Sequence, residues 1–242
     1  MMIRNDREQI IDVEISQSAN LALQWALASW WRTLGVKPQY VIGHSVGEIS
    51  SACFSGALTL KEAIQIIRHR SRLQKPKQGE GEMLAVGMSR DEASEIIKPF
   101  GENVSIAATN SPFSVTIAGP KAIIENLQSK IEHKNLFCRK LNTGIAYHSA
   151  QMEGIHDEFV SSIDNLDPTD TRIPMLSTVT GGLIKGKELN AEHWWRNIRE
   201  PVIFDQIFTF LRNNQGMIFL EIGAHPVPVS YTHLTLPTSD LV

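Results

Sequence analysis

The spacing of apolar and polar positions divides the chain into helical and extended stretches. From Ser16 to Leu34 apolar residues spread around most of a helical surface, which predicts a helix buried on more than one side. Gly35 ends that helix, and the apolar run at 40–42 that follows predicts a strand. A second helix is predicted from Leu60 to Gln74, with apolar residues on neighbouring turns. Helix, strand and helix in this order indicate a parallel-sheet α/β core.

Between residues 83 and 146 the pattern changes to short units. Their order is strand, helix, strand, strand, helix, strand, which is typical of the ferredoxin-like βαββαβ unit. Strands are expected at 83–88, 104–110, 114–119 and 137–141. One helix is expected from a cap at 89–92 to about Phe100, and a second from Pro120. We therefore predict a small subdomain at 83–146, inserted into a discontinuous α/β core formed by residues 1–82 and 147–227.

The core is expected to resume after this insertion. A helix is predicted at 151–163, a turn at Gly181–Gly182, and a second helix at 204–213. The apolar run Met217–Gly223 predicts a buried parallel strand that ends in a loop.

The stretch 40–53 has the pattern of a nucleophile elbow. An apolar strand leads into Gly43-x-Ser45-x-Gly47, and a helix of small residues follows. The glycines fit a tight strand-to-helix turn in which flanking side chains would collide. Such a turn exposes the Ser45 hydroxyl and directs the first N–H groups of the helix at a forming oxyanion. A glycine-rich turn with a capping serine is the alternative, and the flanking strand and helix favour the elbow of an α/β-hydrolase-like core.

Composition narrows the class of protein. A net charge of -3 gives no electrostatic basis for nucleic acid or an anionic membrane as a general partner. Cys53 and Cys138 lie far apart without metal-ligand spacing, so we predict reduced thiols and no metal site. No apolar run approaches a membrane span, and the first residues lack the apolar region of a signal peptide. These features predict a cytoplasmic protein.

Several spaced motifs resemble one family, the acyltransferase domains of modular polyketide synthases and their relatives, the malonyl-CoA:acyl carrier protein transacylases. Together they extend from about Asp12 to Val227, and their shared order makes the resemblance specific. They are Gly43–Glu48, Arg70–Leu73, Asn110–Pro112, Tyr147–Met152, Ser177–Gly181, Trp194–Asn197 and Glu221–Pro226.

The resemblance implies ping-pong acyl transfer through an acyl-serine. Ser45 would be the nucleophile, and His148 the base, oriented by a backbone carbonyl oxygen. The Val46 N–H would donate to the oxyanion. Arg70 would bind the free carboxylate of a malonyl-type donor, because a guanidinium binds a carboxylate through two hydrogen bonds. The implied substrates are malonyl-CoA and the phosphopantetheine thiol of an acyl carrier protein. No bound cofactor is expected, and neighbouring synthase domains are the other expected partners.

In this family the tetrapeptide ending at the catalytic histidine tracks the choice of donor. Malonyl-selective domains tend to have His-Ala-Phe-His and methylmalonyl-selective ones Tyr-Ala-Ser-His; here it is Ile145-Ala146-Tyr147-His148. The Tyr147 ring would crowd an α-methyl branch, which favours malonyl, although Ile145 matches neither type. One methyl group contributes only about 1–3 kcal/mol to selectivity. His44 and Asn110 are expected to shape the pocket.

The chain departs from the family pattern in two places. The family begins with a strand and a Gly-Gln-Gly loop whose glutamine N–H shares the oxyanion hole, and no such loop occurs here. At the other end, residues 228–242 do not resemble the family and are interpreted as a non-native tail. We therefore expect a domain truncated at both ends.

Two other functions stay open. One is a serine hydrolase or thioesterase with the same elbow, but that fold places its histidine near the C-terminus, whereas about ninety residues follow His148. The other is a catalytically impaired fragment that binds a carrier protein without turnover. The missing loop favours this second alternative, and the joint presence of Ser45, His148 and Arg70 argues against it.

Overall fold

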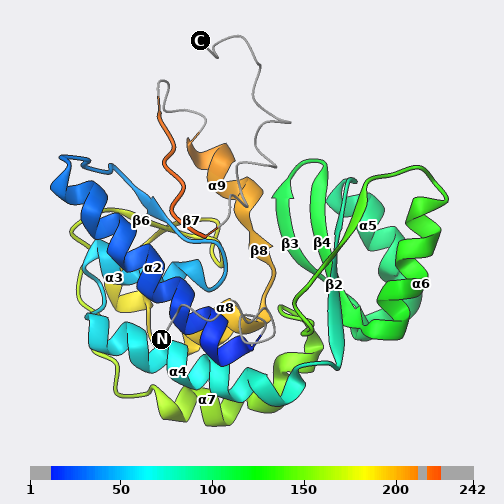
Figure 1. The fold of residues 1–242 in the computed structure, drawn as a ribbon, viewed down its shortest axis with the longest axis horizontal. Helices are drawn as coiled ribbons and strands as arrows, with labels where there is room; N and C mark the ends of the chain where they lie inside the picture. The colour runs from blue at the N-terminus through cyan, green and yellow to red at the C-terminus, as the bar shows by residue number, and fades with distance from the viewer. Residues whose placement is uncertain (1–11, 212–216, 225–242) are drawn as a thin grey trace, which may run out of the picture.

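Two sheets organise the chain in the computed structural model, which describes residues 12–211 and 217–224. A helical lobe surrounds the smaller sheet, and a second lobe is built on the larger one (Figure 1). The helical lobe contains α2 (Val13–Thr33), β1 (Val41–Ile42), α3 (Gly47–Ser55), α4 (Leu60–Gln74), α7 (His156–Ser162), β6 (Met175–Ser177), β7 (Gly182–Ile184) and α8 (Ala191–Arg199). The second lobe contains β2 (Gly81–Val86), α5 (Arg90–Ile97), β3 (Ser105–Ser111), β4 (Ser114–Pro120), α6 (Lys121–Glu132) and β5 (Cys138–Leu141). Between them run β8 (Val202–Ile203) and α9 (Phe204–Leu211).

The sheet of the helical lobe is mixed, which corrects the prediction of a parallel sheet. Its order is β1-β6-β7, with β1 parallel to β6 and β6 antiparallel to β7. Gly181, at φ +77°, allows the turn that folds β7 back onto β6. The sequence pattern predicted this turn but not the strand after it. Helices α2, α3, α4, α7 and α8 contribute to one apolar core with β6.

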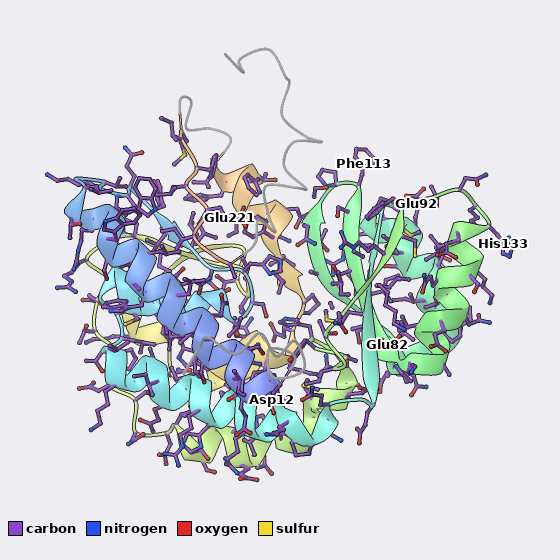
Figure 2. All side chains as sticks on the ribbon, in the orientation of Figure 1. Asp12, Glu82, Glu92, Phe113, His133 and Glu221 are labelled. Carbon is purple, nitrogen blue, oxygen red and sulfur yellow. The ribbon has the colours of Figure 1, made fainter. Side chains whose placement is uncertain are left out.

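The second lobe has the predicted order of strands and helices. Its strands pair in the order β5-β2-β4-β3, each antiparallel to its neighbour, with the apolar sides of α5 and α6 in the same core. Phe113 marks the exposed tip of the β3–β4 hairpin (Figure 2). Strand β8 joins the free edge of β3 in parallel, pairing Ala108 with Val202 and Thr109 with Ile203. This link between the lobes was not predicted.

The predicted helices are present with shifted ends. Helix α2 begins before Ser16 because the Asp12 carboxylate accepts from the Glu14 N–H at 2.9 Å and caps it. Helix α4 has the predicted bounds, set by a capping box between Thr59 and Glu62. The helix predicted at 151–163 is divided into a 3₁₀ turn, Ala150–Ile155, and α7. Further 3₁₀ turns lie at Lys75–Lys77, Lys98–Asn103 and Gly186–Glu188.

The strand predicted at Met217–Gly223 is wrong for this structure. Residues 217–222 have no regular secondary structure, and Ile218 is 96% exposed. A strand requires a hydrogen-bonded neighbour as well as apolar side chains, and neither sheet of the described chain includes this run. The proposed tail at 228–242 and the end of the last motif lie outside the described residues. None of the helices in the described ranges is long and apolar enough to cross a membrane.

Candidate active site

Ser45 lies on the turn between β1 and α3, with a backbone φ of 54°. Non-glycine residues rarely adopt this left-handed conformation, and it clusters at functional sites. A Cβ atom at Gly43 would lie 2.2 Å from the Glu48 backbone nitrogen, so only glycine fits there. A Cβ at Gly47 would meet the Gln24 side chain at an ordinary 3.6 Å. The expectation of a collision is therefore correct for Gly43 and wrong for Gly47.

The Ser45 hydroxyl and the His148 imidazole lie within hydrogen-bonding distance. Ser45 Oγ is 2.7 Å from His148 Nε2, and His148 Nδ1 is 2.8 Å from the Glu200 carbonyl oxygen. The carbonyl can only accept, so Nδ1 carries the proton and Nε2 is left to accept from the serine. Burial, and then the charge of Arg70, lowers the pKa of His148 to about 3. The imidazole is therefore neutral at pH 7 and able to take a proton.

The Arg70 guanidinium lies beside the same hydroxyl. Its Nη2 is 3.5 Å from Ser45 Oγ, and its Nη1 donates to Gln17 Oε1 at 3.1 Å. The side chain is only 2% exposed, and burial lowers the pKa of Arg70 to about 10. Within the described residues, its Nε has no hydrogen-bond partner. A buried guanidinium with an unused donor is suited to an anion that arrives from outside.

Tyr147 and Ile145 have different surroundings. Tyr147 forms a side-chain hydrogen bond with Gln17, and burial raises the pKa of its hydroxyl. Gln17 in turn donates from Nε2 to Gln74 Oε1 at 2.7 Å. Ile145 is fully buried in the apolar core of the helical lobe. Of the two predicted selectivity residues, Tyr147 is thus linked through Gln17 to Arg70.

His44 joins the elbow to the second lobe. Its Nε2 lies 2.8 Å from Asn110 Oδ1 on β3, and its ring lies 5.4 Å from the ring of Phe204. Burial lowers the pKa of His44, which favours the neutral ring. The Nε2 atom of His44 thus faces Asn110 on β3. The imidazole nitrogen that faces the Ser45 hydroxyl belongs to His148.

The first N–H groups of α3 are arranged around Ser45. The Gly47 N–H donates to the His44 carbonyl at 3.0 Å, and the Glu48 N–H donates to the Ser45 carbonyl at 3.0 Å. Val46 precedes both, as the N-cap residue of α3. In residues 12–211 and 217–224, no group of His, Cys, Asp and Glu side chains could hold a metal ion.

Two residues that the sequence analysis did not single out also support the elbow. Glu48 is fully buried, and its carboxylate accepts from the Thr178 N–H at 2.7 Å and from Ser177 Oγ at 3.0 Å. Asn197 donates from Nδ2 to the Ser45 carbonyl at 3.1 Å. Both residues lie inside the recognised motifs, and this position was the signal that could have drawn attention to them. A sequence alone does not show which backbone group a side chain meets.

Comparisons with known proteins identify the family of this chain. The family of acyl transferase domains matches residues 1–240. The chain is 36% identical over 231 residues to polyketide synthase GfsA of Streptomyces halstedii, covering 94% of this chain and 3% of that protein. It is 35% identical to the acyltransferase domain from module 8 of the salinomycin polyketide synthase, with a TM-score of 0.89 over 93% of this chain and 53% of that one.

A loading acyltransferase from the avermectin modular polyketide synthase is 31% identical, with a TM-score of 0.91 over 94% of this chain and 73% of that one. The chain thus spans only a small part of the curated relatives that it matches. The family match extends over nearly the whole chain, and the relatives named above are polyketide synthases. This chain therefore belongs to the acyl transferase domain family.

Proposed function

We propose that this chain transfers a malonyl-type acyl group from coenzyme A to the phosphopantetheine thiol of an acyl carrier protein, through an acyl-serine. One observation supports this above the others. Ser45 Oγ lies 2.7 Å from a buried, neutral His148 and 3.5 Å from the Arg70 guanidinium. A nucleophile, a base and a cation for an acidic substrate are thus within reach of one another.

In the first half-reaction, His148 Nε2 takes the hydroxyl proton as Ser45 Oγ attacks the thioester carbonyl. The Val46 N–H donates to the oxyanion of the tetrahedral intermediate. When the carbon–sulfur bond breaks, His148 returns its proton to the departing thiolate. Free coenzyme A and the acyl-serine ester are the products, and the enzyme has no net change in protonation.

In the second half-reaction, His148 takes the proton of the phosphopantetheine thiol. The thiolate attacks the acyl-serine carbonyl, and the bond from that carbon to Ser45 Oγ breaks. His148 then reprotonates the serine. The hydrogen bond from Nδ1 to the Glu200 carbonyl keeps the same tautomer in both halves, since a carbonyl can accept but not donate.

Arg70 supports a dicarboxylic donor rather than acetyl. Its Nε lacks a partner in the described part of the chain, and its Nη1 and Nη2 face the Gln17 amide oxygen and the Ser45 hydroxyl, both uncharged. A malonyl carboxylate would place a negative charge directly against this buried guanidinium. We expect Tyr147, which is linked to Arg70 through Gln17, to limit the size of the α-substituent. Ile145 belongs to the apolar core against which Tyr147 packs. We expect His44 and Asn110 to shape the side of the acyl pocket that faces the second lobe.

The architecture that we propose is an α/β-hydrolase-like core, 1–82 and 147–227, with a ferredoxin-like subdomain at 83–146. The antiparallel order β5-β2-β4-β3 supports the second part, and the strand–turn–helix around Ser45 supports the first. The proposed partners are an acyl carrier protein and neighbouring synthase domains. Their support is that the relatives are polyketide synthases much longer than this chain.

Intact mass spectrometry tests the proposal. The purified chain is mixed separately with malonyl-, methylmalonyl- and acetyl-CoA, beside a Ser45→Ala variant, and pantetheine is then added as the thiol acceptor. We expect a malonyl adduct that is absent from the variant and that pantetheine removes as malonyl-pantetheine. No adduct from any donor contradicts acyl transfer by this chain. An adduct that water removes as fast as pantetheine does would indicate a hydrolase instead.

A further inference from the structure

One side of α8 contacts both proposed catalytic residues. His193, Asn197 and the C-terminal cap Glu200 follow one another at spacings of four and three, which places them on one side of a helix. Asn197 Nδ2 donates to the Ser45 carbonyl at 3.1 Å, and the Glu200 carbonyl accepts from His148 Nδ1 at 2.8 Å. His193 Nε2 lies 3.4 Å from the Glu48 carboxylate.

We propose that α8 is a positioning element that holds the Ser45 hydroxyl and the His148 imidazole at reacting distance. Asn197 acts on the nucleophile, the Glu200 carbonyl acts on the base, and the buried His193 ring packs beside Glu48 of α3, with Nε2 3.4 Å from its carboxylate. This inference rests on the proposed acyl transfer, because it assigns a shared support to the two residues that carry out the reaction.

On the nucleophile side, Asn197 holds the backbone of a residue in an unfavourable conformation. Ser45 has a φ of 54°, and such a conformation persists only where surrounding contacts fix it. Its carbonyl accepts two hydrogen bonds, one from the Glu48 N–H and one from Asn197 Nδ2. The first bond is local to the elbow. The second bond connects the elbow to α8.

On the base side, the Glu200 peptide is fixed from three directions. Its N–H donates to the Arg196 carbonyl at 2.7 Å. Its carboxylate accepts from Arg196 Nε and Nη2 at 2.9 and 3.0 Å. Pro201 follows, which restricts the backbone of the residue before it. The carbonyl that orients His148 is therefore held by the same helix that holds Ser45.

The N-terminal end of α8 is packed against buried groups of its surroundings. The His193 ring packs edge-on against Trp194, at 5.1 Å and 85° between rings. Trp194 donates from Nε1 to the Leu189 carbonyl at 2.9 Å. Glu48, which His193 faces, lies in the first turn of α3, directly after the elbow. A shift of α8 along its axis would thus disturb this contact together with those of Asn197 and Glu200.

Asn197→Leu separates positioning from stability. Leucine has the same number and branching of side-chain heavy atoms as asparagine but cannot donate to the Ser45 carbonyl. Asn197 Oδ1 is buried without a partner in the described structure, so the substitution also removes an unsatisfied acceptor. We therefore expect a melting temperature close to that of the wild type. Glu192→Gln, on the exposed side of the same helix, is the matched control.

The rate of acyl-serine formation from malonyl-CoA is the first readout. We expect Asn197→Leu to lower the saturated rate about 10-fold to 100-fold, as misplaced reacting groups do, with an unchanged half-saturating concentration because Arg70 is intact. Glu192→Gln should match the wild type. A rate for Asn197→Leu within twofold of the wild type overturns the proposal. An unreactive wild type instead contradicts the proposed function.

A second readout does not need turnover. In ¹⁵N-histidine-labelled protein, the Nδ1 proton of His148 bonded to a carbonyl gives a downfield resonance. His193→Phe keeps the ring packing on Trp194 but removes the nitrogen that faces Glu48. We expect this resonance to shift or broaden in His193→Phe and in Asn197→Leu, and to stay in place in Glu192→Gln. An unchanged resonance in both α8 variants overturns the proposal, whether or not the chain is active.

Discussion

Replacing Arg70 with methionine should stabilise the fold while removing the preference for a dicarboxylic donor. A pKa lowered from 12.5 to about 10 corresponds to about 3 kcal/mol of unfavourable free energy from burying the charge. The variant loses the hydrogen bond to Gln17 and leaves that amide oxygen unpaired, at a cost of about 1 kcal/mol each. The net gain is about 1 kcal/mol, which raises the melting temperature by about 2–4 °C.

The effect on the substrate has the opposite sign. Removing one partner of a buried charge pair costs at least about 2 kcal/mol, or a factor of about 30. We expect kcat/KM for malonyl-CoA to fall by that factor or more in Arg70→Met, because the carboxylate loses its cation. Acetyl-CoA has no such carboxylate, so its kcat/KM should change by less than about threefold.

The assay measures transfer from each donor to pantetheine, with calorimetry of the same samples. Arg72→Met is the control, since Arg72 lies on the same helix in an exposed ion pair with Glu158. The control should leave the ratio of malonyl to acetyl transfer unchanged. Equal losses for both donors in Arg70→Met would refute the assignment of Arg70 to the carboxylate. A lower melting temperature would refute the charge-burial reasoning.

Four further predictions concern the elbow and its surroundings. Gly43→Ala should destabilise the fold by more than about 3 kcal/mol in urea titrations, because its Cβ would lie 2.2 Å from a backbone nitrogen, whereas Gly47→Ala should be tolerated. Because the pKa of His148 is lowered to about 3, kcat/KM should stay within twofold between pH 7 and pH 5; a tenfold loss would contradict this. Below about pH 6.5 His148 binds a proton in the unfolded chain but not in the folded one, because its pKa is lowered by folding. The free energy of unfolding should therefore fall as the pH decreases below about 6.5. Tyr147→Ser should raise methylmalonyl relative to malonyl transfer about 5-fold to 150-fold in competition assays, and no change would reject its steric role.

Much of the fold could be predicted because local chemistry determines it. The apolar stripe and capping residues of α4 specify its bounds, and the alternation of short strands and helices specifies the order in the second lobe. Pairing is not local. The apolar run at 217–222 reads as a strand, yet a strand needs a neighbour with free backbone groups, which periodicity does not supply. The parallel pairing of β3 with the two-residue β8 could not be predicted for the same reason, because periodicity does not show which strands become neighbours.

The residues of the candidate site also differ in how far local sequence predicts them. Ser45 was predictable because the elbow imposes a local pattern of glycines, and the recognised motifs marked His148 and Arg70. Their meeting depends on the fold, since 103 positions separate Ser45 from His148. Gln17 was missed because it looks like any polar residue on a helix. It becomes informative only when its amide lies against Arg70 and Gln74.

The pairing of β3 with β8 has a consequence for exchanging subdomains between related synthases. A graft cut before β2, which begins at Gly81, and after residue 146 separates the transplanted unit cleanly along the chain, but not in space. The incoming sheet must present an edge that accepts Val202 and Ile203, and an amide in the place of Asn110 for His44. Because Glu200 lies two residues before this strand, a poor fit between the two lobes would disturb the orientation of His148. Chimeras that restore these contacts should keep activity where simple replacements lose it.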